Sequence, residues 1–458
     1  SISPMNKPDP RLDFLIRDLP SPESARRFFQ QFSEKNPSHA ARLQKNEGLF
    51  SDVLALASYS PLLAATLIQN PDYVSWLGGK RSESAVQDKD ELLESLARFS
   101  LTNSQVEPHV LLARFRRREL LRIFLRDIRQ LGTVAEITEE ISNLADAILE
   151  HAFRLARQEM DNRFGPPFEV DGKGREMPST ACVVSLGKLG SKELNYSSDI
   201  DLLFIFSAEG STKGTGSKTL VTNREYFVKF AGAVTQLVGR QTGEGAAYRV
   251  DLRLRPHGRV GALALSLKET VRYYLNEGRN WEQQVLIRSR PSAGDAALYR
   301  EFFSRVEETV FRKGRNANDA LREVYLSKER IDQHHRPDAG VDVKLGHGGI
   351  REIEFIAQAL QLAHGGRDRW LRVPHTLISL ARLADRGFIT GDERSALFKA
   401  YGFLRRLEHL LQMEHGLQTH TVPAEASKRV ELAARMKLGG IGEFEAAIRE
   451  QMSAVHRI

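Results

Sequence analysis

SLGKLGSKELNYSSDIDLLFIF, residues 185–206, decides the fold. The turn from Gly187 to Gly190 is followed by a polar run and then by Asp199 and Asp201, one residue apart at the start of an apolar run. The segments ACVVSLG and DIDLLFIF are short, apolar and partly β-branched, which is typical of buried strands. The stretch therefore predicts two strands joined by a polar loop, with two carboxylates where the second strand begins.

The spacing of these aspartates indicates a site. Positions two apart on a strand project to the same side, so Asp199 and Asp201 project together. Adjacent carboxylates repel each other near a core, and a divalent cation such as Mg²⁺, which prefers oxygen ligands, removes that cost. Asp251 lies on the polar face of AYRVDLRLR, residues 247–255, which alternates like a strand. If the strands are neighbours, three carboxylates converge, enough for a two-metal site that drives phosphoryl or nucleotidyl displacement.

A second set of residues has the chemistry to hold phosphate oxygens. Backbone N–H groups of a glycine turn bind phosphate, small hydroxyls donate to it, and arginines clamp it in bidentate fashion. The candidates are Gly187, Lys188, Gly190, Ser197, Ser198, Arg253 and Arg255. Each element has a simpler explanation: a solvated strand edge, a plain turn, or arginines that only neutralise Asp251. Their combination favours a metal and nucleotide site.

The chain on both sides of this segment has helical patterns. We expect an α+β, mostly helical protein with a helical N-terminal region (1–165), an α/β domain (175–315) and a helical bundle (318–458). Residues 166–178 carry Pro and Gly without a period, which predicts a linker or loop. The arginine-rich helix at 109–131 is interpreted as a solvated face that pairs with acidic neighbours, in preference to a phosphate site.

Composition limits the class of protein. With 458 residues, 41% apolar and 27% charged, the chain has the composition of an ordinary globular protein with roughly two to four domains. Cys182 is the only cysteine, which excludes an internal disulfide and fits a reducing cytoplasm. The charge of +7 is dispersed, which argues against a nucleic-acid partner, and no apolar run approaches the roughly 20 residues of a membrane span. His334 and His335 are neighbours on a helical stretch, so their rings diverge and make a poor metal pair.

Four motifs together carry a resemblance to a known family: GKLGSKELNYSSDIDLLF (187–204), YRVDLRLRPHG (248–258), GRNWEQQVLIRSR (278–290) and GGIREIEFIAQALQL (348–362). The first two resemble the nucleotidyltransferase superfamily, which has the fold of DNA polymerase beta. All four resemble the bifunctional glutamine synthetase adenylyltransferase/adenylyl-removing enzymes, from about residue 50 to the end of the chain. Gly187-Lys188 stands at the superfamily's Gly-Ser position, and Ser191 and Lys192 stand where the family has Gly-Gly or Gly-Arg.

The resemblance implies a function. Enzymes of that family carry two such halves: the C-terminal half transfers AMP from ATP to a tyrosine of glutamine synthetase, and the N-terminal half removes it by phosphorolysis, giving ADP. This chain has one motif set, and its GGIREIEF looks more like the adenylyl-removing N-terminal half. The implied cofactor is Mg²⁺, one or two ions held by Asp199, Asp201 and Asp251. The implied partners are glutamine synthetase, the PII regulatory protein and the C-terminal adenylyltransferase half of a longer chain.

Two questions stay open at this level. Lys344, Arg351 and Glu352 stand at a helix entry, VKLGHGGIREIEF, that either completes the site by binding an anion or forms ion pairs where domains pack. The alternative functions are adenylylation from ATP and uridylylation of PII. A nucleic-acid polymerase is disfavoured by the dispersed charge, and a regulatory module with a dead site by the presence of all three aspartates.

Overall fold

The structure is a computed structural model that describes residues 10–80, 85–214, 219–314, 316–332 and 340–458. His334 and His335 lie outside the described residues. The described chain is α+β and mostly helical, as the sequence predicts. Among the described residues, no helix combines the length and the apolar character that a bilayer span requires.

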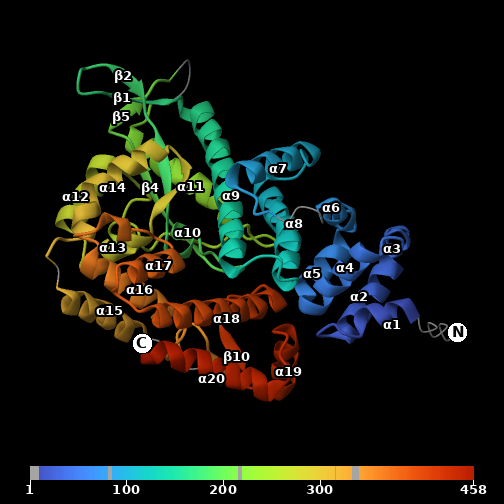
Figure 1. Ribbon diagram of the computed structural model, residues 1–458. Helices are drawn as coiled ribbons and strands as arrows, with labels where there is room; N and C mark the ends of the chain where they lie inside the picture. Colours follow the sequence, from blue (N-terminus) through green and yellow to red (C-terminus); the bar gives the residue numbers. More distant parts are fainter. Residues whose placement is uncertain (1–9, 81–84, 215–218, 315, 333–339) are drawn as a thin grey trace.

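Helices make up the first part of the chain, on the right of Figure 1 and across its centre. Their starts follow sequence signals: prolines open several of them, and Asp88 and Thr133 form capping boxes with the glutamates three residues later. The helices are α1 (Pro10–Ile16), α2 (Pro22–Lys35), α3 (Pro37–Gln44), α4 (Glu47–Tyr59), α5 (Pro61–Gln69), α6 (Asp72–Lys80), α7 (Lys89–Thr102), α8 (Pro108–Ile128) and α9 (Val134–Phe164).

The central part alternates strands and helices. Its elements are β1 (Pro167–Val170), β2 (Glu176–Pro178), β3 (Ala181–Leu186), α10 (Gly187–Gly190), β4 (Ile200–Phe206), β5 (Gly210–Thr212), α11 (Asn223–Gly239), β6 (Val250–Asp251), the 3-10 turn η1 (Gly258–Val260), β7 (Ala264–Ser266), α12 (Leu267–Asn276), α13 (Asn280–Val285), η2 (Leu286–Arg288), β8 (Arg290–Gly294) and α14 (Ala296–Val310). The predicted strands at 181–187 and 199–206 are confirmed as β3 and β4.

The main sheet has the order β6-β4-β3-β8, and β7 also pairs with β4. β3 runs antiparallel to β4 and β8, whereas β6 and β7 run parallel to successive parts of β4. Alternate residues of β3 and β4 enter two different apolar cores. Val183, Leu202 and Phe204 join the core that contains α8, α9 and α11 residues. Val184 and Leu203 join a second core with residues of α12, α14 and α16. Helices therefore cover both faces of the sheet (Figure 1).

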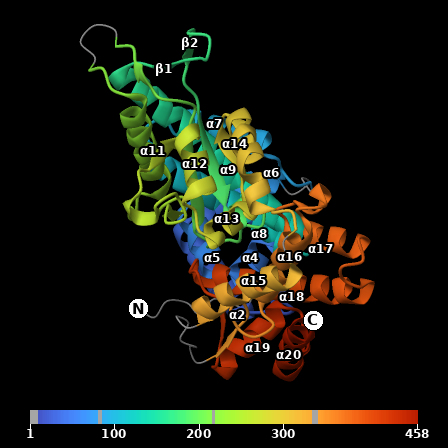
Figure 2. The same ribbon diagram turned by 90° about the vertical axis from the view of Figure 1, so that its left-hand side faces the viewer.

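Two local predictions are wrong. Residues 166–178 are not a plain linker, because β1 pairs with both β2 and β5 in a small sheet that projects from one end of the molecule (Figures 1 and 2). The strand expected over residues 247–255 ends at Asp251, and the chain turns from Leu252 onward. The arginine alternation beyond Asp251 therefore does not place its side chains on one strand face.

The final part is again helical. It consists of α15 (Ala317–Asp332), β9 (Gly340–Asp342), α16 (Ile350–His364), η3 (Arg369–Leu371), α17 (Thr376–Asp385), α18 (Gly391–His415), β10 (Thr421–Pro423), α19 (Ala426–Arg435) and α20 (Ile441–Arg457). The longest helix of this part is α18. This helix packs against α4, α5 and α9 as well as against α16, α17 and α20, so it joins the two helical parts of the chain.

The arginines of α8 are mostly not solvated. Arg122 and Arg126 are buried and both form ion pairs with Glu140 of α9. The expectation of acidic partners is confirmed, but the expectation of a solvent-facing surface is wrong for these two residues, because α9 covers them.

Candidate active site

Three carboxylates gather at one end of the main sheet, near enough that the charges of Asp251 and Asp199 both act on Asp201, although their oxygens do not all lie within 4.8 Å of one another. Asp201 is the register partner of Asp251 in the parallel pair of β4 and β6, and directly paired residues point to the same side of a sheet. Asp199 stands two residues before Asp201, at the entry to β4. Leu203 and Ile205, which follow Asp201 at intervals of two along β4, line the second apolar core. Asp201 therefore lies on the same face of the sheet as this core, at the end of the strand.

The glycine turn lies against this cluster. Gly187 has a left-handed backbone with φ of 60°, and a Cβ atom there would lie 2.8 Å from Oδ2 of Asp201. Leu186, the residue before it, is the register partner of Asp201. Glycine at this position allows both the backbone conformation and the close approach to the carboxylate.

Two arginines balance two of the three carboxylates. Arg249 donates to Asp199 at 2.5 Å, and Arg253 donates to Asp251 at distances of 2.5–3.0 Å. Within the described part of the chain, the Asp201 carboxylate has no hydrogen bond or ion pair. Arg253 thus neutralises Asp251, as the simpler explanation of the arginines proposed, whereas Arg249 pairs with Asp199 instead.

The pKa values of Asp201 and Asp251 shift in opposite directions because only Asp251 is paired with an arginine. Burial raises the pKa of Asp201 to about 7, and the negative charges of Asp251 and Asp199 add to the rise. Burial also acts on Asp251, but the hydrogen bonds from Arg253 outweigh it and keep the pKa of Asp251 below its ordinary value. The cluster therefore contains one carboxyl, Asp251, that hydrogen bonds keep ionised, and one, Asp201, that no cation pairs with directly among the described residues.

Lys188 points away from the aspartates, toward α18. Its Nζ atom lies 3.6 Å from Oε1 of Glu408, and both side chains are buried. Burial lowers the pKa of Lys188 to about 7, with Glu408 acting in the opposite direction. Burial also opposes ionisation of Glu408, but Lys188 and Arg405 outweigh it and lower the pKa of Glu408. The contact ties the glycine turn to the C-terminal helices.

The loop between β3 and β4 is held by the N-terminal helices on one side. Lys192 has a left-handed backbone, and its ammonium group donates to Asn143 and, at 3.0 Å, to Asp146 of α9. The Tyr196 hydroxyl donates to Asp127 of α8 at 3.0 Å. These bonds fix the loop that leads from the glycine turn to the aspartates.

The C-terminal helices hold the same loop from the other side. The buried Glu193 carboxylate accepts hydrogen bonds from Thr376 of α17 at 3.1 Å and from Tyr401 of α18 at 2.5 Å. Arg405 of α18 donates to the Glu193 carbonyl oxygen at 2.7 Å. Sequence reasoning missed these anchors, since their partners lie far away in the sequence.

The other predicted phosphate ligands are used within the chain. The Ser197 N–H donates to Gln412 at 3.1 Å and its carbonyl accepts from Arg249, while the Ser198 hydroxyl donates to Asn195. A Cβ at Gly190 would lie 2.0 Å from the Arg288 carbonyl oxygen, so this glycine allows close packing. The buried Arg255 guanidinium donates to the carbonyl oxygens of Leu252, Arg259 and Gly261 and holds the turn after β6.

Lys344, Arg351 and Glu352 do not form one group. The positive charge of Lys344 opposes the rise in the pKa of Asp201 and also helps to lower the pKa of Glu408 in α18, so Lys344 lies in the region between the aspartates and α18. Arg351 is half-buried and stacks over Phe355. Glu352 instead accepts from the Gly348 N–H at 2.8 Å and contacts His347 and His456.

Comparison with known proteins adds an independent observation. The family model for glutamate-ammonia ligase adenylyltransferase matches residues 50–305, which include all three aspartates and the glycine turn. The chain belongs to this family. A second model, that of GlnD PII-uridylyltransferase, matches residues 319–458.

Curated relatives of this chain are also named as adenylyltransferases. Proteins from Nitrosococcus oceani and Hahella chejuensis, 35% and 34% identical over 86% and 88% of this chain, are both named bifunctional glutamine synthetase adenylyltransferase/adenylyl-removing enzyme. The matches cover 40% and 41% of those relatives. This chain therefore spans about two fifths of the length of the relatives it matches.

Proposed function

We propose that this chain removes AMP from glutamine synthetase by phosphorolysis, converting adenylyl-tyrosine and phosphate into tyrosine and ADP. The observation that carries the proposal is the register of Asp201 with Asp251, with Asp199 beside them and Gly187 against Asp201. Within a family whose curated relatives are named for both adenylyl transfer and adenylyl removal, a single carboxylate cluster fits one of the two activities.

The donor set fits magnesium. Asp199, Asp201 and Asp251 offer only carboxylate oxygens, the ligands that Mg²⁺ prefers. Among the described residues no cation pairs directly with Asp201, whose pKa is raised by burial and by two acidic neighbours. One or two ions at these residues would supply the positive charge that offsets the charge of the phosphates and of the leaving tyrosyl oxygen.

The reaction then requires positioning more than proton transfer. An oxygen of hydrogen phosphate attacks the adenylyl phosphorus, and the bond from phosphorus to the tyrosyl oxygen breaks with its electron pair on that oxygen. The proton of hydrogen phosphate passes to the tyrosyl oxygen, whose ordinary pKa is about 10, so no separate base is needed. Arg253 and Lys344 are the cations best placed to orient phosphate oxygens, and Gly187 holds the backbone close to Asp201.

We also propose a domain organisation for the chain. Residues 175–315 form a nucleotidyltransferase domain of the DNA polymerase beta type, between a helical region before residue 165 and a helical bundle from 318 to 458. The chain corresponds to the adenylyl-removing N-terminal half of a longer cytoplasmic protein, with PII and the adenylyltransferase half as regulatory partners.

Two alternatives use the same carboxylates. One is adenylylation from ATP, the activity for which the matching family, glutamate-ammonia ligase adenylyltransferase, is named. Uridylylation of PII is favoured by the match of residues 319–458 to the PII-uridylyltransferase model. The match covers the helical part and not the aspartates, which lie in the segment matched by the adenylyltransferase model.

One experiment separates the three activities. The chain is incubated with adenylylated glutamine synthetase, phosphate and Mg²⁺, and ADP release is followed. Parallel reactions contain unmodified glutamine synthetase with ATP, and PII with UTP. We expect ADP only in the first reaction, and none without Mg²⁺ or with the Asp201→Asn variant. Labelling only from ATP or only from UTP would show that the corresponding alternative is the correct one.

A further inference from the structure

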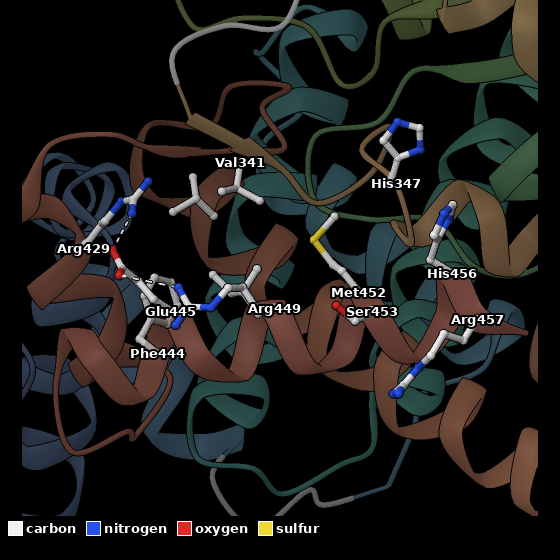
Figure 3. A pocket seen from close by; sticks show the side chains of 12 residues that line it. Val341, His347, Arg429, Phe444, Glu445, Arg449, Met452, Ser453, His456 and Arg457 are labelled. Carbon is white, nitrogen blue, oxygen red and sulfur yellow. Dashed lines mark hydrogen bonds and ion pairs between the residues drawn. The ribbon is translucent and has the colours of Figure 1, made fainter.

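A cavity of about 570 Å³ lies in the C-terminal part of the chain, between α20 and the strands β9 and β10. Val341, Val422, Phe444 and Ile448 give it apolar walls. Figure 3 shows Arg429 and Glu445 at one end of this cavity and His347 and His456 at the other. Neither histidine has a role in the proposed phosphorolysis.

The two histidines share a carboxylate. His347 precedes α16, Glu352 lies in the first turn of α16, and His456 lies in the last turn of α20. The Nδ1 atom of His456 is 3.4 Å from Oε2 of Glu352, and the Nδ1 atom of His347 is 3.9 Å from Oε1. One ligand atom from each residue lies within 4.8 Å of the other two.

We infer that His347, Glu352 and His456 form a binding site for a divalent transition metal, with Zn²⁺ as the best-fitting ion. Two imidazoles and one carboxylate are a recurrent zinc donor set, which leaves a fourth position for water or another ligand. Imidazole nitrogens suit zinc and its neighbours in the transition series, whereas the all-carboxylate cluster at Asp201 suits magnesium. The two sites therefore differ in the metal that they select.

The geometry permits coordination with small movements. Tetrahedral zinc with bonds of about 2.1 Å requires ligand atoms about 3.4 Å apart, so the atoms need to approach by an ångström or so. The histidine side chains have the freedom to do this, since those of His347 and His456 are 82% and 60% exposed. Glu352, only 12% exposed, is already oriented by the hydrogen bond from the Gly348 N–H.

A bound metal would link the start of α16 to the end of α20, which are far apart in the sequence. Both histidines line the cavity, so the fourth position is accessible from it. Glu352 was a candidate for the phosphate site, but a carboxylate repels phosphate. A role as a metal ligand beside the two histidines fits its position better.

The test uses the full chain, freed of metal and then titrated with Co²⁺ and Zn²⁺ in the presence of excess Mg²⁺, which occupies the carboxylate cluster. We expect one Co²⁺ per chain with the visible absorption of a histidine-containing site, displaced by Zn²⁺. Single variants His347→Ala and His456→Ala should lose about 100-fold or more in affinity, because each removes a ligand. His415→Ala is the matched control, since His415 is 63% exposed and outside the cluster, and it should bind as the native chain does.

Thermal unfolding gives a second readout that does not depend on activity. Zn²⁺ should raise the melting temperature of the native chain and of His415→Ala, but not of the other two variants. Circular dichroism checks that each variant is folded. The inference is overturned if the native chain binds no Co²⁺ with such a spectrum, or if His347→Ala and His456→Ala bind Co²⁺ as tightly as the control.

Discussion

Replacing Gly187 by Ala tests the reasoning about the active site most directly. The added Cβ atom would lie 2.8 Å from Oδ2 and 3.7 Å from Cγ of Asp201, so the carboxylate has to shift from its position. Alanine is also strained at a φ of 60°, by about 1–2 kcal/mol. Because a misplacement of about 1 Å at a reacting centre costs about 100-fold in rate, we expect ADP release to fall by that order. The free energy of unfolding should fall by only about 1–2 kcal/mol.

A matched control separates strain from displacement of the carboxylate. Gly387, just after α17, has a φ of 74°, and a Cβ there would meet no atom within 4 Å. Gly387→Ala should therefore lose the same stability and keep the native rate of ADP release. Urea unfolding and initial rates of phosphorolysis are measured on both variants. Equal rates in the two variants would refute the claim that Gly187 keeps Asp201 in its working position.

Three more predictions concern buried ionisable groups. Burial and acidic neighbours raise the pKa of Asp201 to about 7, so the folded chain holds its proton more tightly than the unfolded chain and loses stability as the pH rises toward 7. Without metal, Asp201→Asn should thus raise the free energy of unfolding above pH 7 by up to about 4 kcal/mol, since each unit of pKa change corresponds to about 1.4 kcal/mol. This gain should vanish as the pH falls toward about 4; a loss of stability above pH 7 would contradict the prediction. Glu408→Gln leaves Lys188 buried without its acidic partner and should cost about 3 kcal/mol in urea unfolding, whereas adding Lys188→Met should cost less than the sum of the single changes. Strict additivity would show that the pair is not coupled. Cys182 is buried, and burial raises its pKa to about 12, so a thiol reagent at neutral pH should label it only as fast as the chain opens; rapid labelling of the native chain would disagree with its position in the core.

The aspartates could be predicted because their signal is local. The two-residue spacing at the start of an apolar run predicted that Asp199 and Asp201 project to the same side of a strand. The strand β4 does begin there, at Ile200. Asp251 was found by the same period, although only Val250 and Asp251 are in a strand. The arginines that follow were placed wrongly because the chain turns at Leu252. The hairpin of β1 and β2 was missed since its strands are short and β2 is exposed along its whole length, which leaves no apolar alternation to indicate a strand.

Partners that lie far away in the sequence could not be predicted. Arg122 and Arg126 look like a solvated surface until α9 brings Glu140 against them. The contact of Lys188 with Glu408 likewise depends on how α18 packs under the glycine turn. The cluster of His347, Glu352 and His456 was also missed, because the loop before α16 and the end of α20 meet only in the folded chain.

The loop from Lys188 to Ser198 takes its bonds from α8 and α9 on one side and from α17 and α18 on the other. A fragment cut at residues 175 and 315 would retain all three aspartates but would expose Glu193 and Lys192 to water without their counterparts. The position of the carboxylate cluster thus depends on segments at both ends of the chain. Any ligand or protein that shifts α18 relative to α9 would therefore also move the turn at Gly187, because this turn and the loop after it are bonded to both helices.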